Sequence, residues 1–232
     1  MKRSLLIVVG AGSDVAQRTI PGLSAFDDFV GFSTQSGEIR FAGSSQKLHN
    51  YSQGSPIDSQ IDRYLPSKSD VSHLGFISLT GLKDDSLLIR SSESNLENLF
   101  EVNLLIPTVF SRAILARYLG VRSNFVFVSS SGALAGAAGV VGYSASKHGL
   151  LGLSRGIAVE YGRLGVVSNC LALGLLDLGM GKSLDEKQRT EFLQRTTTRR
   201  AVREESVTMS LDFLLRTEDV TGTTLYCDGG YH

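Results

Sequence analysis

Short, continuously apolar runs alternate along the chain with longer amphipathic segments. The apolar runs are typical of parallel strands covered on both faces, and they lie at residues 5–9, 29–32, 75–79, 125–128, 166–171 and 224–227. The amphipathic segments predict helices at residues 14–20, 95–119, 142–161, 185–195 and 204–215. Pro107 lies inside the second helix and predicts a kink there. The polar stretch 33–69, which Gly and Pro interrupt, predicts no definite element.

The alternation continues through residues 1–232 without a break in composition or an internal repeat. It predicts a single α/β domain built on a Rossmann-type doubly wound parallel sheet. We expect about seven strands, with helices on both faces of the sheet.

The chain carries 23 basic and 23 acidic side chains, so its formal net charge is +0. This neutrality argues against nucleic-acid binding, which calls for a basic excess or stripe. No apolar run approaches the roughly 18 residues of a membrane span, and the four histidines show no metal-ligand spacing. Cys170 and Cys227 lack a CxxC partner, which predicts buried, inert thiols. We therefore expect a soluble, cytoplasmic protein that binds no metal, nucleic acid or membrane.

A glycine-containing turn joins the first strand to the first helix and predicts a site for the phosphates of a dinucleotide. Glycine lets the backbone approach a ligand, and the start of the helix offers free N–H groups. The residues that this interpretation assigns to the cofactor are Gly10, Gly12, Ser13, Asp14 and Val15. A plain turn between strand and helix is the alternative. The Asp14 carboxylate would repel a diphosphate, unless it turns back as a helix N-cap.

Tyr143 and Lys147 are spaced i and i+4 on a predicted helix, so both point to the same face. A nearby ammonium favours the phenolate, so it lowers the pKa of a tyrosine from about 10. Such a tyrosine is suited to acid or base catalysis on a carbonyl or alcohol. Ser130 follows a strand at its carboxyl end, where parallel sheets place their ligands. Together the three residues predict an active site.

With these motifs the chain resembles the short-chain dehydrogenase/reductase family, and within it the 3-oxoacyl-(acyl-carrier-protein) reductases. The resemblance covers nearly the whole chain and includes the turn at 10–16, Val102-Asn103-Leu104, Ser130, Tyr143-xxx-Lys147 and the closing stretch 221–230. It implies an NAD(P)-dependent oxidoreductase in which the nicotinamide supplies hydride.

The resemblance also implies a role for each catalytic residue. Tyr143 would protonate the substrate carbonyl oxygen, and Ser130 would polarise it through a hydrogen bond. Lys147 would lower the pKa of Tyr143 and hold the ribose hydroxyls of the cofactor. Asn103 would anchor a water in a proton relay that ends at Lys147; a buried amide that satisfies backbone groups is the alternative for Asn103.

The chain departs from the family pattern around the cofactor. Asp14 and Ala16 replace two glycines of the turn, and Leu173 and Leu178 replace a proline and a threonine near the nicotinamide. The resemblance assigns further cofactor contacts to Thr80, Gly81, Tyr143, Lys147, Gly174 and Leu176. These changes predict a cofactor that is held more weakly or differently.

The end of the second strand predicts the choice of cofactor. An acidic residue there would bind the ribose 2′-hydroxyl of NAD, whereas residues 31–36 contain none. Ser33 and Thr34 offer small hydroxyls that suit a 2′-phosphate, so we expect NADP(H) to be preferred over NAD(H). Asn50 falls where the family contacts adenine; an ordinary polar loop residue is equally compatible.

Two features bear on partners. Gly149, Gly152 and Gly156 share one helix face, and the resemblance suggests a homotetramer, or a dimer, built on this helix and residues 95–119. Packing on the protein's own sheet is the alternative. Arginines gather near a substrate lid at about residues 175–200, where they suit an acidic carrier protein or form a solvated face; they are Arg195, Arg199, Arg200 and Arg203.

Three hypotheses follow. The first is NADP(H)-dependent reduction of a ketone to a secondary alcohol, in which a carrier-bound 3-oxoacyl thioester becomes the 3-hydroxyacyl form. The second is the same chemistry on a free small molecule such as a polyketide, sugar or steroid. The third is a non-enzymatic member of the family that senses a cofactor or binds a partner.

Overall fold

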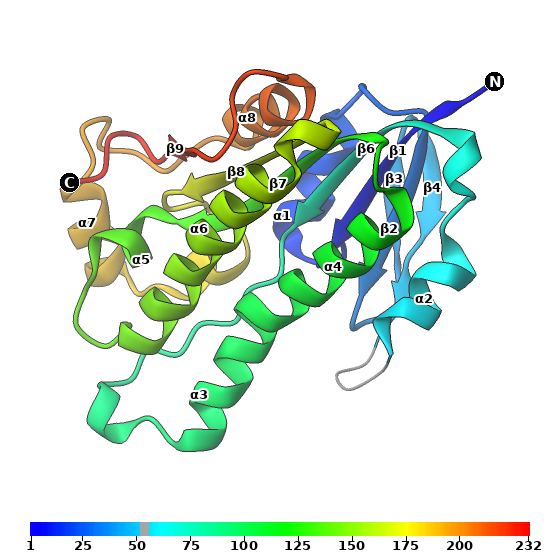
Figure 1. Ribbon diagram of the computed structural model, residues 1–232. Helices are drawn as coiled ribbons and strands as arrows, with labels where there is room; N and C mark the ends of the chain where they lie inside the picture. The colour runs from blue at the N-terminus through cyan, green and yellow to red at the C-terminus, as the bar shows by residue number, and fades with distance from the viewer. Residues whose placement is uncertain (52–55) are drawn as a thin grey trace.

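A seven-stranded parallel sheet forms the centre of the computed structural model, which describes residues 1–51 and 56–232 (Figure 1). The strands follow the order β5-β2-β1-β6-β7-β8-β9 across the sheet. Their bounds are β1 (Arg3–Val9), β2 (Asp28–Ser33), β5 (His49–Asn50), β6 (Val71–Ser78), β7 (Arg122–Ser130), β8 (Val166–Leu173) and β9 (Thr224–Cys227). The order reverses between β1 and β6, so the carboxyl ends of these strands flank the crevice in which doubly wound sheets bind ligands.

Helices cover both faces of this sheet, which confirms the predicted fold class. Their bounds are α1 (Asp14–Thr19), α2 (Ile57–Tyr64), α3 (Glu93–Phe100), α4 (Ile106–Tyr118), α5 (Ser131–Ala135), α6 (Val141–Tyr161), α7 (Glu186–Gln194) and α8 (Glu204–Arg216). One core cluster joins the sheet to α2, α4 and α6 through residues such as Ile61, Phe110 and Leu150. A second cluster, on the other face, includes Ile20 and Leu211.

A β-hairpin covers part of the second face, within the stretch for which the sequence predicts no definite element. Its strands are β3 (Glu38–Phe41) and β4 (Ser44–Lys47), which pair antiparallel. The side chains of β3 alternate between exposed and buried, as one covered face requires. Ile39 and Phe41 enter the core, and the Phe41 ring stacks on Phe29 of β2 at 5.2 Å. Thus a hairpin follows β2 where a doubly wound pattern predicts a helix.

The predicted helix 95–119 is interrupted by a π-helical segment, Glu101–Leu105, between α3 and α4. Pro107 lies in the first turn of α4 and has no N–H to donate to the Asn103 carbonyl four residues earlier. The structure shows a π-helical segment directly before this proline, while the kink itself stays a prediction. The whole run Glu93–Tyr118 is long and apolar enough to cross a membrane. Phe110 and Ile114 of this run pack in the core, which accounts for apolar positions on its inner face.

Candidate active site

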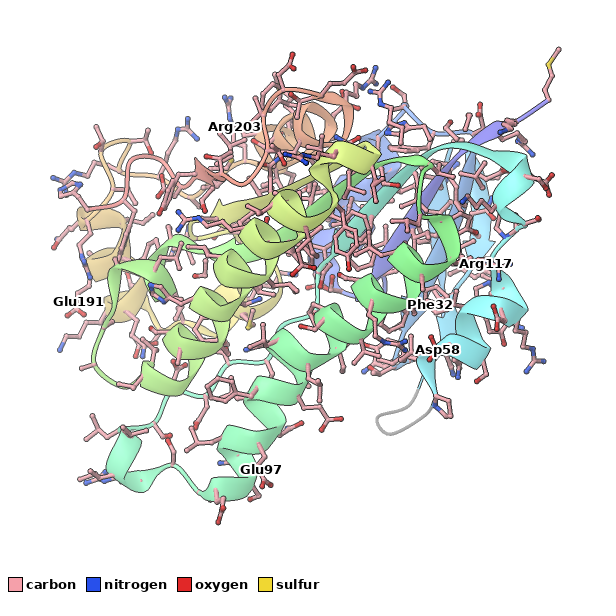
Figure 2. The ribbon with its side chains drawn as sticks, viewed as in Figure 1. Phe32, Asp58, Glu97, Arg117, Glu191 and Arg203 are labelled. Carbon is pink, nitrogen blue, oxygen red and sulfur yellow. The ribbon has the colours of Figure 1, made fainter. Side chains whose placement is uncertain are left out.

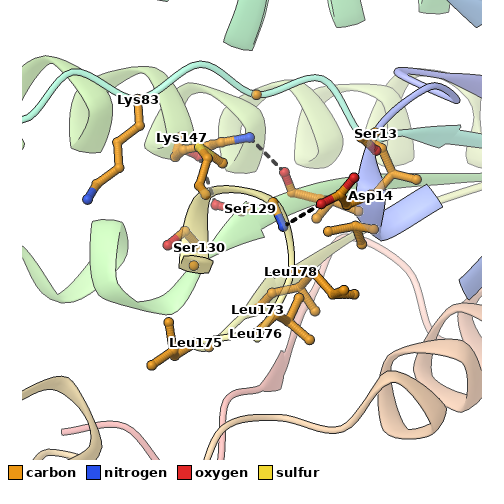
Figure 3. A pocket seen from close by; sticks show the side chains of 18 of the residues that line it. Ser13, Asp14, Lys83, Ser129, Ser130, Lys147, Leu173, Leu175, Leu176 and Leu178 are labelled. Carbon is orange, nitrogen blue, oxygen red and sulfur yellow. Dashed lines mark hydrogen bonds between the residues drawn. The ribbon is translucent and has the colours of Figure 1, made fainter. Parts of the chain in front are cut away.

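A cavity of about 280 Å³ opens at the carboxyl ends of β6, β7 and β8, next to the glycine turn (Figure 3). Its wall combines residues from the glycine turn, these strand ends, α6 and the lid. The predicted site residues that line it are Ser13, Asp14, Val15, Thr80, Gly81, Ser130, Tyr143, Lys147, Gly174 and Leu176. The structure thus brings Tyr143, the predicted proton donor, together with Ser130 and part of the glycine turn in the wall of one cavity.

Gly10 and Gly12 shape this turn without lining the cavity. Gly10 has a φ of 81°, and a Cβ there would lie 2.7 Å from the backbone carbon of Leu79. A Cβ on Gly12 would lie 2.5 Å from Ser33 Oγ. Both glycines therefore let the turn pack against the ends of β6 and β2, and the backbone N–H of Gly10 donates to the Phe32 carbonyl at 3.0 Å.

Ser13, and not Asp14, caps the first helix. Ser13 Oγ accepts a hydrogen bond from the Ala16 N–H at 3.2 Å. The Asp14 carboxylate is turned toward the lid, where it accepts from the Gly179 N–H at 3.2 Å and from Lys182 Nζ at 3.4 Å. These contacts, the Gly179 hydrogen bond first, lower the pKa of Asp14. The expectation that Asp14 turns back as the N-cap is therefore wrong, because the neighbouring serine hydroxyl already serves the helix.

Ser130 ends β7 and starts α5, which fixes its hydroxyl at the edge of the sheet. Its Oγ accepts from the Ala133 N–H at 3.3 Å, as a helix N-cap does. This contact uses a lone pair, so the hydroxyl proton stays available for a second acceptor. Ser130 can therefore donate a hydrogen bond to a substrate oxygen inside the cavity.

Tyr143 is buried in the first turn of α6 and lies in hydrogen-bond contact with Ser130. Burial raises the pKa of the Tyr143 phenol above its ordinary value of 10, and the contact with Ser130 opposes that rise only in part. The expected lowering of this pKa by Lys147 is therefore wrong: burial and the Asp85 carboxylate raise it, and Lys147 is not among the groups that shift it. At neutral pH the phenol is protonated, as a proton donor to a carbonyl oxygen must be.

Lys147 is fully buried one turn further along α6. Its Nζ donates to the carbonyls of Thr80 at 3.1 Å and Val128 at 3.0 Å. Burial lowers the pKa of Lys147 from 10.5 to about 8. An ammonium has three N–H donors, so one is left for a ligand in the cavity that Lys147 lines. This donor fits the ribose hydroxyls of a nicotinamide cofactor.

Asn103 lies in the π-segment and is fully buried. Its Nδ2 donates to the Leu82 carbonyl at 2.8 Å and to Ser146 Oγ at 2.9 Å, while Oδ1 accepts from the Leu82 N–H at 2.7 Å. Both N–H donors are thus used within the protein. These contacts fix the strand-end loop that carries Thr80 and Gly81 against α6, so they give Asn103 a positioning role. The relay through a water stays a prediction.

Ser33, Thr34 and Asn50 lie outside the cavity wall, at the ends of the paired strands β2 and β5. Ser33 is buried and its Oγ accepts from the Gln35 N–H at 3.1 Å, whereas Thr34 is exposed. Asn50 donates to Ser36 Oγ at 2.9 Å. These groups form a polar strand end beside the glycine turn, and their contact with a cofactor stays a prediction.

Much of the apolar wall was not predicted. Beside Leu173 and Leu178, which the sequence places near the nicotinamide, it includes the side chains of Leu79, Leu175, Met180, Leu184 and Phe192. The sequence signal for one of them was an apolar pair, Phe192-Leu193, within the otherwise polar segment 185–195. Such a pair marks a helix that packs on something, and here Phe192 faces the cavity beside Gly132. Gly174 keeps the backbone close to β9, because a Cβ there would lie 2.6 Å from Asp228 Cα.

Comparison with known proteins decides the family. The family model described as enoyl-(acyl carrier protein) reductase matches residues 71–232. The chain belongs to the short-chain dehydrogenase/reductase family. Its membership confirms the predicted resemblance and makes the protein an oxidoreductase that uses a nicotinamide cofactor. This favours the two enzymatic hypotheses over the non-enzymatic one.

Individual relatives agree with this assignment. The chain is 28% identical over 186 residues to the 3-oxoacyl-(acyl-carrier-protein) reductase FabG of Chlamydia muridarum, covering 79% of this chain and 74% of the relative. It is 30% identical over 152 residues to the hydroxy(phenyl)methyl-succinyl-CoA dehydrogenase subunit BbsD of Thauera aromatica, covering 65% and 61%. The aldohexose dehydrogenase of Thermoplasma acidophilum shares the fold, with a TM-score of 0.80, 20% identity and coverage of 99% and 94%.

Proposed function

We propose that the protein reduces a 3-oxoacyl thioester to the 3-hydroxyacyl form with NADPH. The observation that carries the proposal is that Ser130, Tyr143 and Lys147 line one cavity whose remaining wall is largely apolar. The apolar wall suits an acyl chain, and the hydroxyl pair suits its ketone. Two of the relatives are named for thioester substrates, one on a carrier protein and one on coenzyme A.

The chemistry divides between the cofactor and the chain. When bound, the nicotinamide supplies the hydride that reduces the ketone carbon. Tyr143, which burial keeps protonated at neutral pH, gives its proton to the developing alkoxide. Ser130 donates a hydrogen bond to the same oxygen. Lys147, fixed by two backbone carbonyls, orients the ribose through its third N–H.

The preference for NADPH rests on the end of β2. Residues 33–36 supply hydroxyls and an amide but no carboxylate that would repel a 2′-phosphate. The Ser33 and Ser36 hydroxyls already accept hydrogen bonds from Gln35 and Asn50, so they are held at defined positions. Titration of the wild-type chain with NADPH and NADH tests the preference, and equal affinity would contradict it.

An acyl carrier protein is the proposed carrier, with the arginines near the lid as its contact. Arg195, Arg199, Arg200 and Arg203 are all exposed. Arg195 donates to the His232 carbonyl and stacks over the Tyr231 ring at 4.5 Å, so it is held in place. A group of exposed arginines, of which Arg195 is held in place, favours an acidic partner by charge.

The groove between α4 and α6 is the proposed contact between copies of the chain in a homotetramer or dimer. Gly152 and Gly156 face this groove, and a Cβ on either would meet nothing within 4 Å. Gly149 differs, since a Cβ there would lie 2.6 Å from Leu104 of the same chain. Light scattering of Gly156→Arg beside the wild-type chain tests the groove.

We place the protein in the cytoplasm, since both cysteines are free thiols.

The substrate experiment compares three acceptors under identical conditions: acetoacetyl carrier protein, acetoacetyl-coenzyme A and a free ketone such as ethyl acetoacetate. Oxidation of NADPH is followed by its absorbance. We expect kcat/KM to fall from the carrier-bound thioester to the free ketone. Faster turnover of the free ketone would support the second hypothesis, and no turnover of any thioester despite tight binding of NADPH would refute the proposal.

A further inference from the structure

A carboxylate of the glycine turn is tied to the substrate lid across the cofactor cavity. Asp14, which Figure 3 shows in the cavity wall, accepts hydrogen bonds through Oδ2 from the Gly179 N–H at 3.2 Å and from Lys182 Nζ at 3.4 Å. The residues lie 165 and 168 positions apart in the chain. Asp14 and Gly179 both line the cavity, so the contact closes one side of the space in which the cofactor would lie.

The part of the lid that contacts Asp14 is an ordered helical turn. Residues Gly179–Ser183 form a 3₁₀ helix, and the Gly181 N–H donates to the Leu178 carbonyl at 2.9 Å. A Cβ on Gly181 would lie 1.8 Å from the Leu176 carbonyl oxygen, so the turn folds tightly onto the segment before it. Within the lid itself, the Asp177 carboxylate pairs with Arg189 of α7. Lys182 is therefore presented to Asp14 by a fixed backbone.

Asp14 poses an electrostatic problem that Lys182 can solve. A dinucleotide laid along the turn brings two negatively charged phosphates toward a wall that contains the Asp14 carboxylate. Like charges at this range repel, which weakens binding. Lys182 contacts this carboxylate, while Arg18 acts on it from a greater distance within α1. Lys83, another cation of the cavity wall, is paired with Asp85 at 2.7 Å.

We propose that Lys182 and the Gly179 N–H neutralise Asp14 from the lid, so that the cofactor is held fully only when the lid is docked on the glycine turn. The inference rests on the proposed function, since it concerns the cofactor of that same site. Asp14 and Lys182 then act as positioning residues: Asp14 lines the cavity, Lys182 contacts Asp14 from the lid, and together they couple lid position to cofactor affinity.

The coupling is expected to leave global stability almost unchanged. Both side chains are more than half exposed, at 53% for Asp14 and 60% for Lys182. Exposed ion pairs contribute little to the free energy of unfolding. An effect on cofactor affinity without an effect on unfolding therefore separates this role from a merely structural one.

The test measures the dissociation constant of NADPH by nicotinamide fluorescence for a set of matched variants. Lys182→Met leaves the Asp14 charge uncompensated and should weaken binding about tenfold at low salt. Lys182→Arg keeps the charge and should bind almost as the wild type does. Lys187→Met is the control, because Lys187 is an exposed lid-side lysine that pairs with Glu191 and does not line the cavity.

A double variant tests the coupling itself. In an Asp14→Asn background the carboxylate is gone, so Lys182→Met should change the affinity less than about twofold. Hydrogen exchange without cofactor supplies a second readout: Asp14→Ala removes the acceptor of the Gly179 N–H and should speed exchange in peptides that span 176–184.

The outcomes separate the two proposals. Equal NADPH affinities of Lys182→Met and Lys187→Met would overturn the proposed coupling of Asp14 to Lys182 and leave the proposed function standing. The same conclusion would follow if Lys182→Met lost as much affinity in the Asp14→Asn chain as in the wild type. A wild-type chain that binds neither NADPH nor NADH would overturn the proposed function and, with it, this inference. Unchanged exchange in Asp14→Ala would contradict the lid contact directly.

Discussion

Residues 1–70 and 71–232 both contribute to the wall of one cavity. They differ in how closely their sequences match the family pattern. The family model matches from Val71 onward, and this part carries Ser130, Tyr143 and Lys147 at their expected places. The first part carries a glycine turn that holds an aspartate and a hairpin in place of a helix. Figure 2 shows side chains of both parts, with Phe32 and Asp58 in the first and Glu97 and Arg203 in the second. The difference teaches that the part matched by the family model holds the predicted catalytic side chains, whereas the part before it departs from the family pattern in the turn that we propose for the cofactor phosphates.

The largest expected effect is on the rate of reduction, and it tests the catalytic residues of the second part of the chain. Tyr143→Phe removes the proton donor and should lower kcat about 1000-fold, while the dissociation constant of NADPH stays within about twofold. The control is Tyr226→Phe, because Tyr226 is 54% exposed on β9. Stopped-flow oxidation of NADPH measures the rate. A rate near that of the wild type would show that Tyr143 is not the acid.

The next largest expected effect is on the free energy of unfolding, and it tests the glycine turn in the first part of the chain. Gly10→Ala must place a Cβ 2.7 Å from the Leu79 backbone at a φ of 81°, so it should cost about 3 kcal/mol of unfolding free energy. Gly43→Ala has almost the same φ of 80° with nothing within 4 Å, so it should cost about 1 kcal/mol from backbone strain alone. Urea denaturation of both variants measures the difference, and equal costs would contradict the close packing of the turn.

The buried lysine predicts how activity depends on pH. The pKa of Lys147 is lowered from 10.5 to about 8 by burial, so the amine is charged at pH 7 and becomes neutral as the pH rises through 8. Tyr143 stays protonated in this window, because its pKa is raised above 10. We expect kcat/KM for ketone reduction to fall about tenfold per pH unit above 8.

A pH profile from 6 to 9.5, taken with the wild type and Lys147→Arg, checks this expectation. Arginine keeps its charge throughout the range, so the variant, although slower, should show no decline above pH 8. A flat wild-type profile up to pH 9.5 would contradict the assignment of this ionisation to Lys147.

The smallest expected effect is on stability and concerns the helix cap in the glycine turn. Ser13→Ala removes the acceptor of the Ala16 N–H and should cost about 1 kcal/mol of stability without changing kcat. The control is Ser44→Ala on the exposed strand β4. A loss of kcat in Ser13→Ala would show that the cap also takes part in the chemistry.

The sequence predicted those parts in which local pattern and tertiary structure agree. Apolar runs predicted six strands of the sheet to within a few residues, whereas the seventh, β5, lies in the stretch for which no element was predicted. The i, i+4 spacing placed Tyr143 and Lys147 on one face of α6. Pro107 predicted a kink, because the missing N–H is a property of the residue itself, and the structure shows a π-helical segment directly before it. The hairpin escaped prediction, since its short strands are mostly polar and only Ile39 and Phe41 are buried.

Other features depend on contacts that no local pattern encodes. The pairing of Asp14 with Lys182 joins residues 168 positions apart, and the two hydrogen bonds that tie Asn103 to Leu82 require the π-segment. The pKa of Tyr143 was predicted in the wrong direction, because the sequence shows a lysine four residues away but not the depth of burial that raises this pKa.

Transfer of label from cofactor to substrate tests the central claim most directly. The wild-type chain is incubated with acetoacetyl carrier protein and NADPH that carries deuterium at both C4 positions of the nicotinamide, and the product is analysed by mass spectrometry. We predict a 3-hydroxybutyryl thioester with one deuterium at the carbinol carbon, and a loss of product in Tyr143→Phe. Unreduced thioester after complete occupancy by the cofactor would contradict the account.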